Sequence, residues 1–162
     1  MIRLMGFGLL KPKNKILGAD IAGRVEAVGR NVKQFQPGDE VFGELSGCGF
    51  GGFAEYVCAH ENALVLKPAN ISFEEIAAVL MAAITALQGL RDKGQIQPGQ
   101  KVLINGASGG VGTFAVQIAK SFGAEVTAVC STGKLDMVRS IGADRSLTTR
   151  KKISPKMDRV MT

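Results

Sequence analysis

The pattern of apolar and polar residues changes character at Pro68. Before this residue the chain consists of short apolar runs separated by glycine-rich turns, which is typical of β-strands joined by tight reversals. The pattern predicts strands at 21–28, 40–42, 53–59 and 64–66. Together these segments indicate a small, irregular β-barrel or sandwich.

Beyond Pro68 the apolar residues recur at helical spacing. Ser72 followed by Glu75 forms a capping-box pattern, and the apolar positions continue up to Gly94, which predicts a long helix over 72–93. The pattern then predicts a strand at 101–105, a helix at 110–122, a strand at 125–130 and a helix at 134–141. The strand, helix and strand in this order form a β-α-β unit.

The segment GASGGVG lies where the predicted strand 101–105 meets the predicted helix 110–122. Glycine suits this place for three reasons: the chain reverses sharply, a pyrophosphate must approach backbone N–H groups, and the helix must pack closely on the strand. The pattern therefore predicts dinucleotide binding, with a purely structural tight turn as the alternative. The candidate cofactor-binding residues in this loop are Gly106, Ser108, Gly109, Gly110, Val111 and Gly112.

The end of the next predicted strand bears on the choice between the two nicotinamide cofactors. A carboxylate about 20 residues beyond the glycine loop would bind the ribose 2′-hydroxyl of NAD. Here the strand ends in CSTGK at 130–134, and the first acid is Asp136. Because hydroxyl and ammonium groups suit a 2′-phosphate, Ser131 and Lys134 are predicted to bind NADPH. The alternative is that Lys134 is only an exposed residue of a first helical turn.

Composition excludes several classes of protein. The chain has 162 residues, 46% hydrophobic and 21% charged, as in a globular protein of one ordinary domain or two small ones. Its longest nearly unbroken apolar stretch, 76–87, is too short to cross a bilayer, so we expect no membrane partner. Cys48, Cys58 and Cys130 form no CxxC pair, which argues against disulfides and structural zinc and favours a cytoplasmic setting.

The formal net charge of +6 comes almost entirely from the C-terminal end. Residues 145–162 contain six basic side chains against the single acid Asp158, a net charge of +5. This segment has no aromatic residue to stack on bases and no helix or strand pattern to hold it in a groove. We therefore interpret it as a solvated, disordered tail and expect no nucleic-acid partner.

Several motifs together resemble one enzyme superfamily. GADIAGRVEAVG, PGDEVFG, GGFAEYV, PGQKVLINGASGGVG and SIGAD are similar to the medium-chain dehydrogenases/reductases, in their zinc-free quinone oxidoreductase branch. The resemblance covers residues 1–144 and implies an α/β protein with two incomplete domains. These are a truncated GroES-like catalytic domain at 1–71 and a partial Rossmann domain, a doubly wound parallel sheet, at 72–144.

The resemblance also implies an activity, namely NADPH-dependent hydride transfer to a quinone, an enone or a related carbonyl compound. Thr85 occupies the place where family members keep a Thr-Ala pair facing the nicotinamide, so it is the candidate catalytic residue. A helix threonine bonded to a backbone carbonyl is the alternative. Tyr56 is interpreted as a packed barrel residue and His60 as a surface residue. The resemblance is compatible with a homo-oligomer.

Two other interpretations stay open. In zinc alcohol dehydrogenases of the same superfamily a His-Glu pair stands where this chain has Ala19 and Asp20, so we expect no metal site. The chain also departs from the family pattern after Asp144: the family's typical continuation, translated one base later, reproduces 147–158. This agreement predicts a single-base deletion near codon 146. It makes a non-catalytic degenerate product the second alternative, and we expect the chain as given to be inactive.

Overall fold

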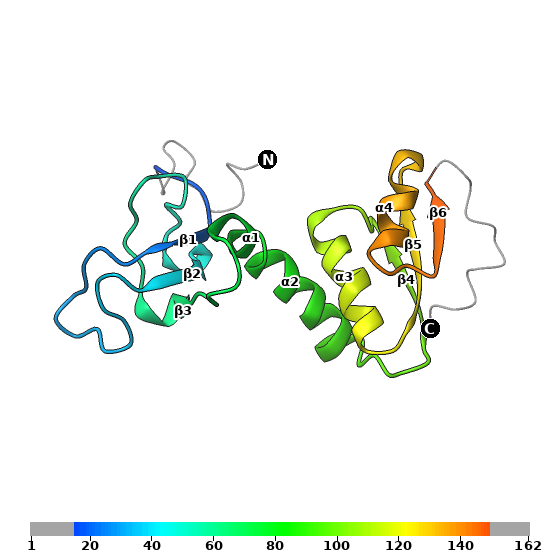
Figure 1. The fold of residues 1–162 in the computed structure, drawn as a ribbon, viewed down its shortest axis with the longest axis horizontal. Helices are drawn as coiled ribbons and strands as arrows, with labels where there is room; N and C mark the ends of the chain where they lie inside the picture. Colours follow the sequence, from blue (N-terminus) through cyan, green and yellow to red (C-terminus); the bar gives the residue numbers. More distant parts are fainter. Residues whose placement is uncertain (1–14, 150–162) are drawn as a thin grey trace, which may run out of the picture. The chain divides into compact units, whose positions relative to one another are not determined.

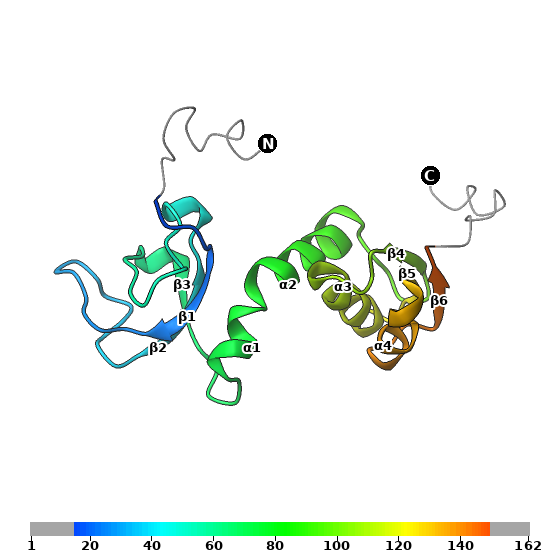
Figure 2. The same cartoon turned by 90° about the horizontal axis from the view of Figure 1, so that it is seen from above.

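The computed structural model describes residues 15–149. The chain divides into two compact units, Met1–Met81 and Ala82–Thr162, which we call the N-terminal unit and the C-terminal unit. Figures 1 and 2 show the elements of each unit in two views. Helix α1 (Phe73–Ala77) packs on strands of the N-terminal unit and belongs to it. The domain bounds 1–71 and 72–144 stay a prediction.

The N-terminal unit contains a three-stranded antiparallel sheet in the order β1-β2-β3. Its strands are β1 (Asp20–Arg24), β2 (Glu40–Glu44) and β3 (Leu64–Leu66), joined by loops and by the short 3-10 helices η2 (Ser46–Cys48) and η3 (Glu61–Ala63). Helix α1 packs against β1 and β2 and buries Ile76. Its first turn confirms the predicted capping box, because the Ser72 side chain accepts the Glu75 N–H at 3.2 Å while the Glu75 carboxylate accepts the Ser72 N–H.

The strand predicted at 53–59 does not form. The Phe53 N–H donates to Leu17 O at 2.9 Å, but no backbone hydrogen bond joins 54–59 to any other part of the described chain. Tyr56 is 76% exposed, so its interpretation as a packed barrel residue is wrong. An alternating pattern produces a strand only where a neighbouring strand completes the hydrogen-bond ladder, and the described residues supply none here.

The single helix predicted over 72–93 is divided into three parts. After α1 the N–H groups of Ala78 and Val79 bond three residues back, which tightens the chain into a turn. Helix α2 (Leu80–Leu87) follows, and η4 (Gln88–Lys93) is a π-helical segment that ends where the Gly94 N–H donates to Gly89 O at 2.8 Å. The periodicity of apolar residues predicted that this segment is helical. It did not predict where the α-helix changes to a tighter turn or to a π-helix, because all three conformations place neighbouring apolar residues on one side.

The C-terminal unit contains a parallel sheet in the order β4-β5-β6 (Figure 1). Its elements are β4 (Lys101–Asn105), α3 (Gly110–Ser121), β5 (Glu125–Cys130), the 3-10 turn η5 (Thr132–Lys134), α4 (Leu135–Ser140) and β6 (Arg145–Thr148). The core includes Val116 of α3, Val126 of β5 and Val138 of α4, each with no exposed area. The structure thus confirms the predicted β-α-β unit.

Strand β6 corrects the expectation that regular structure ends at Asp144. Residues 145–148 pair in parallel with β5, from Thr127 opposite Arg145 to Cys130 opposite Thr148. The predicted disordered tail is therefore wrong for residues 145–149, because the edge of β5 supplies a ladder that the local sequence does not reveal, and the Thr149 N–H continues it by donating to Cys130 O at 3.0 Å. The remainder of the predicted tail, 150–162, lies outside the described residues.

Asp144 holds the chain at the start of β6. Its two carboxylate oxygens lie 2.8 and 2.9 Å from Nζ of Lys120 on α3, and Oδ2 accepts the Val126 N–H at 2.7 Å. The hydrogen bonds from Lys120 and then Val126 lower the pKa of the Asp144 carboxyl below its ordinary value. This carboxylate therefore adds stability above the unfolded-state pKa, about 3.9, and that contribution is lost as the pH falls.

We expect Asp144→Asn to lower the free energy of unfolding at pH 7, with the difference from the unmodified chain shrinking as the pH falls from about 5 towards 3. Urea denaturation at several pH values measures this difference. The matched control is Asp136→Asn, because Asp136 is a fully exposed acid of α4 whose carboxylate, in the described part of the chain, pairs only with Arg139 of its own helix. If the difference in unfolding free energy between Asp144→Asn and the unmodified chain stayed constant over this pH range, the ionised Asp144 carboxylate would not be its cause.

Candidate functional site

The glycine loop forms a tight turn at the carboxyl end of β4. Gly106 has φ of 72°, a left-handed conformation that favours glycine. The Ala107 N–H donates to Val129 O at 3.0 Å, which ties the loop to β5, and the Gly109 N–H donates to Gly106 O at 3.0 Å. These bonds hold the loop between the end of β4 and the start of α3.

Gly112 allows α3 to pack closely on this loop. It is buried, and a Cβ atom there would overlap Gly106 O and lie 2.7 Å from the Cα atom of Ala107. Real Cβ contacts are not this short, and the neighbouring atoms are backbone. A side chain at this position would therefore force α3 away from the loop.

The N-terminus of α3 is open on its outer side. Gly110 and Val111 are exposed, and their N–H groups have no acceptor among residues 15–149. A Cβ at Gly110 would have only the Ala82 Cβ nearby, at 3.9 Å. Because the first N–H groups of a helix carry partial positive charge and lack intrahelical partners, this end can accept an anionic phosphate. The loop therefore fits the pyrophosphate of a dinucleotide, with space at Gly110 and close packing at Gly112.

The other predicted cofactor residues follow the same edge of the sheet. The parallel register places Asn105 beside Val129, and Cys130 beside Thr148, so the carboxyl ends of β4, β5 and β6 lie together. Ser131 and Lys134 come directly after β5 and are exposed. This arrangement is the one in which open parallel sheets bind ligands, beyond the carboxyl ends of the strands.

Two threonines that sequence reasoning missed also lie at this edge. Thr132 Oγ1 is 2.8 Å from Oγ1 of Thr148, so the turn after β5 is joined to the end of β6. Thr132 was visible in the segment CSTGK, but Thr148 was assigned to a disordered tail. The contact between Thr132 and Thr148 depends on β6, which sequence reasoning did not predict. It could therefore not be foreseen that the turn with Ser131 and Lys134 is bonded to this neighbouring strand.

Thr85 lies exposed on α2 in the C-terminal unit, three residues after Ala82. Ala82 is the residue nearest to the open space at Gly110, so α2 passes beside the start of α3. The predicted role of Thr85 near the nicotinamide stays a prediction.

The described residues do not fit a zinc ion. His60 is exposed at the start of η3, which confirms its interpretation as a surface residue. Within residues 15–149, no group of three or more His, Cys, Asp and Glu side chains is placed to hold a metal. No step of a reaction is therefore assigned to a metal here.

Comparison with known proteins identifies the family. A family model for the alcohol dehydrogenase GroES-like domain matches residues 3–69, and one for zinc-binding dehydrogenases matches residues 110–161. The 2-methylene-furan-3-one reductase of Solanum lycopersicum is 42% identical over 84% of this chain and 37% of its own length. The chloroplast envelope quinone oxidoreductase homolog of Arabidopsis thaliana is 42% identical over 82% of this chain and 42% of its own length.

Solved structures agree with this assignment. The CurK enoyl reductase has a TM-score of 0.82 at 36% identity, over 93% of this chain and 44% of its own. The Pseudomonas syringae quinone oxidoreductase has a TM-score of 0.79 at 34% identity, over 85% of this chain and 42% of its own. The chain therefore belongs to the medium-chain dehydrogenase/reductase superfamily of oxidoreductases, as a quinone oxidoreductase-like member with a GroES-like N-terminal domain and a Rossmann-like parallel sheet. It spans about two fifths of the length of these curated relatives.

The comparisons bear on two further expectations. The second family model extends through residues 145–161. The hypothesis of a single-base deletion near codon 146 does not anticipate this match, because residues translated out of frame are not expected to match the family. The names of relatives include chloroplastic and mitochondrial proteins, so a cytoplasmic setting stays a prediction. No helix in the described part of the chain is long and apolar enough to span a membrane.

Proposed function

We propose that the glycine loop binds NADPH, and that the enzyme to which this sequence belongs reduces quinones, enones or related carbonyl compounds. The observation that carries the proposal is the open N-terminus of α3, which presents the Gly110 and Val111 N–H groups beside the carboxyl ends of three parallel strands. The names of relatives, which include quinone oxidoreductases and a furanone reductase, support the substrate class.

Each candidate residue has a separate task in this proposal. The N–H groups of Gly110 and Val111 donate to the pyrophosphate, and Ser131 and Lys134 bind the 2′-phosphate. NADPH supplies the hydride when it is bound. Thr85 is proposed to lie beside the nicotinamide, where a hydroxyl group can donate a hydrogen bond and orient the reacting end.

The choice of NADPH over NADH is tested with Lys134→Ala. We expect this variant to weaken NADPH binding by about 1.5 to 3 kcal/mol, the range for one charge-assisted contact, and to change NADH binding little. Titration of both cofactors by nicotinamide fluorescence measures the two dissociation constants. Arg139→Ala is the matched control, because Arg139 is an exposed base of α4 whose guanidinium, within residues 15–149, forms an ion pair with Asp136 alone. Equal losses for NADPH and NADH would show that Lys134 does not bind the 2′-phosphate.

The proposed function is tested by two measurements on the chain. NADPH binding is measured by titration, and turnover is measured as NADPH oxidation with a simple quinone and with an enone. Absence of NADPH binding at millimolar concentration would overturn the proposal. The turnover assay also tests the sequence-based expectation that the chain as given is inactive.

A further inference from the structure

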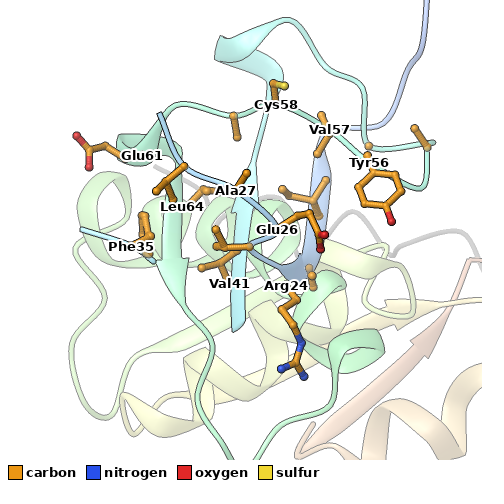
Figure 3. Close-up of a pocket in the computed structure, with 18 of the residues that line it drawn as sticks. Arg24, Glu26, Ala27, Phe35, Val41, Tyr56, Val57, Cys58, Glu61 and Leu64 are labelled. Atoms are coloured by element: carbon orange, nitrogen blue, oxygen red, sulfur yellow. The ribbon is translucent and has the colours of Figure 1, made fainter. Parts of the chain in front are cut away.

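Two features of the chain lie outside the proposed function. One is a cavity of about 870 Å³ in the N-terminal unit, lined by β1 and by the segment 54–59 (Figure 3). It carries no inference, because the family model of this domain begins at residue 3 while the structure describes the chain from residue 15. The other feature is the hydrogen bond between Thr132 and Thr148, and both of its partners are described.

The turn η5 projects from the edge of the parallel sheet. All four residues of 131–134 are exposed, and a Cβ atom added at Gly133 would have no described atom within 4 Å. The Lys134 N–H donates to Ser131 O at 2.9 Å, and the next N–H along the chain donates to Thr132 O. These local bonds close the turn, but they do not fix its direction relative to the sheet.

A side-chain hydrogen bond joins this turn to a neighbouring strand. Oγ1 of Thr132 lies 2.8 Å from Oγ1 of Thr148, the last residue of β6 and 16 positions further along the chain. Within residues 15–149, the side chains of Ser131 and Lys134 form no hydrogen bond or ion pair. The two groups predicted to bind a 2′-phosphate are therefore available to a ligand, while the residue between them is bonded to the sheet.

Thr148 is a well-fixed anchor for the turn. It is half-buried and lies opposite Cys130 in the parallel register. Just beyond it, the Thr149 N–H donates to Cys130 O at 3.0 Å. At the other end of β6 the Asp144 N–H donates to Val126 O at 3.0 Å, so both ends of the strand are bonded to β5.

We propose that Thr148 is a positioning residue for cofactor specificity, which holds η5 through its hydrogen bond to Thr132. In this position the Ser131 hydroxyl and the Lys134 ammonium bind the 2′-phosphate together. The inference rests on the proposed function, in which these two groups bind NADPH. An exposed turn that is ordered before the ligand arrives loses less conformational entropy on binding, so the bond to β6 strengthens binding without touching the cofactor.

The effect is confined to ligands that carry a 2′-phosphate. The N–H groups proposed to bind the other phosphates belong to Gly110 and Val111, on the loop after β4, whereas η5 follows β5. A loosened η5 therefore weakens the 2′-phosphate contact alone. A general loosening of the sheet would instead weaken every nucleotide that uses the glycine loop.

The probes are adenosine 2′,5′-bisphosphate and adenosine 5′-phosphate, which differ only by the 2′-phosphate and do not use the nicotinamide end of the site. Titration calorimetry with the full chain measures both dissociation constants. Thr148→Val keeps the branched shape of the side chain but removes its hydroxyl. We expect it to weaken the bisphosphate about fivefold, as for one neutral hydrogen bond, and to change binding of the monophosphate by less than about twofold.

Two further variants test the hydrogen bond itself. Thr148→Ser retains the hydroxyl, and we expect it to bind the bisphosphate within about twofold of the unmodified chain. Thr132→Val breaks the same bond from the exposed side, and we expect the same selective loss without disturbing β6. Combining Thr132→Val with Thr148→Val is expected to add little, because one bond is lost only once.

Thr127→Val is the matched control, because Thr127 lies in the same β5–β6 ladder, opposite Arg145 at its other end. We expect it to leave the binding of both probes unchanged. In a Lys134→Ala background, Thr148→Val is expected to cost less than in the unmodified chain, because one of the groups that it positions is absent.

Two sets of outcomes separate this inference from the proposed function. If Thr148→Val and Thr132→Val bind the bisphosphate as tightly as the unmodified chain, or weaken both probes equally, Thr148 is not a positioning residue and the proposed function stands. Failure of Thr148→Ser to retain binding would overturn the inference in the same way. If the unmodified chain binds the bisphosphate no more tightly than the monophosphate, the 2′-phosphate is not recognised, and the proposed NADPH site is overturned together with the role of Thr148.

Discussion

Gly112→Ala is expected to destabilise the C-terminal unit by about 3 kcal/mol, the upper part of the range for overpacking. The added Cβ would overlap Gly106 O and lie 2.7 Å from Ala107 Cα. Both neighbours are backbone atoms of a hydrogen-bonded turn, so α3 must shift away from β4 to relieve this overlap. Urea denaturation followed by circular dichroism measures the loss, and NADPH titration is expected to show loss of binding with it.

Gly110→Ala is the matched control for that variant. Two residues earlier in the same helix, its Cβ would have only Ala82 Cβ nearby, at 3.9 Å, so stability is expected to be retained or to rise by about 0.5 to 1 kcal/mol. Nucleotide binding should still weaken, because the methyl group would occupy the space beside the exposed N–H groups. If Gly112→Ala were as stable as Gly110→Ala, the proposed close approach of α3 to the loop would be wrong.

Lys67→Met is expected to lower the stability of the N-terminal unit by about 2 to 3 kcal/mol. Only 5% of the Lys67 side chain is exposed, and its ammonium lies 3.0 Å from Glu40 Oε2. It also donates to Ile71 O at 2.7 Å and Pro68 O at 3.1 Å, and it lies 5.1 Å from the centre of the Phe73 ring. Methionine keeps the apolar stem but removes every donor, leaving two carbonyls and a half-buried carboxylate with fewer partners.

Lys101→Met provides the comparison for this second variant. The Lys101 side chain is 72% exposed and its ammonium lies 3.9 Å from Glu125, so a change of less than about 0.5 kcal/mol is expected. Denaturant unfolding of the two variants under the same conditions measures the difference. If Lys67→Met and Lys101→Met lowered the free energy of unfolding by similar amounts, the buried contacts of the Lys67 ammonium would add nothing to stability.

Local sequence predicted the elements whose bounds are marked by a residue pattern within one short segment. The bounds of β3, β4 and β5 agree with the predicted ranges, and the capping box at Ser72 forms as its spacing requires. The glycine loop also belongs to this class. Its turn depends on a left-handed residue and a small residue within one short segment, so the spacing of Gly106 and Gly112 was sufficient to locate it.

Tertiary structure alone decided which strand-like segments become strands. The alternation at 53–59 predicted a strand for which residues 15–149 supply no partner, while 145–148 forms a strand because the edge of β5 is available. Residues distant in sequence also decided the burial of Lys67 and the hydrogen bonds that the Asp144 carboxylate accepts from Lys120 and Val126. A helix turn or a cap is closed by residues three or four positions away, whereas a strand and a buried charge are stabilised by groups that the chain brings near only when it folds.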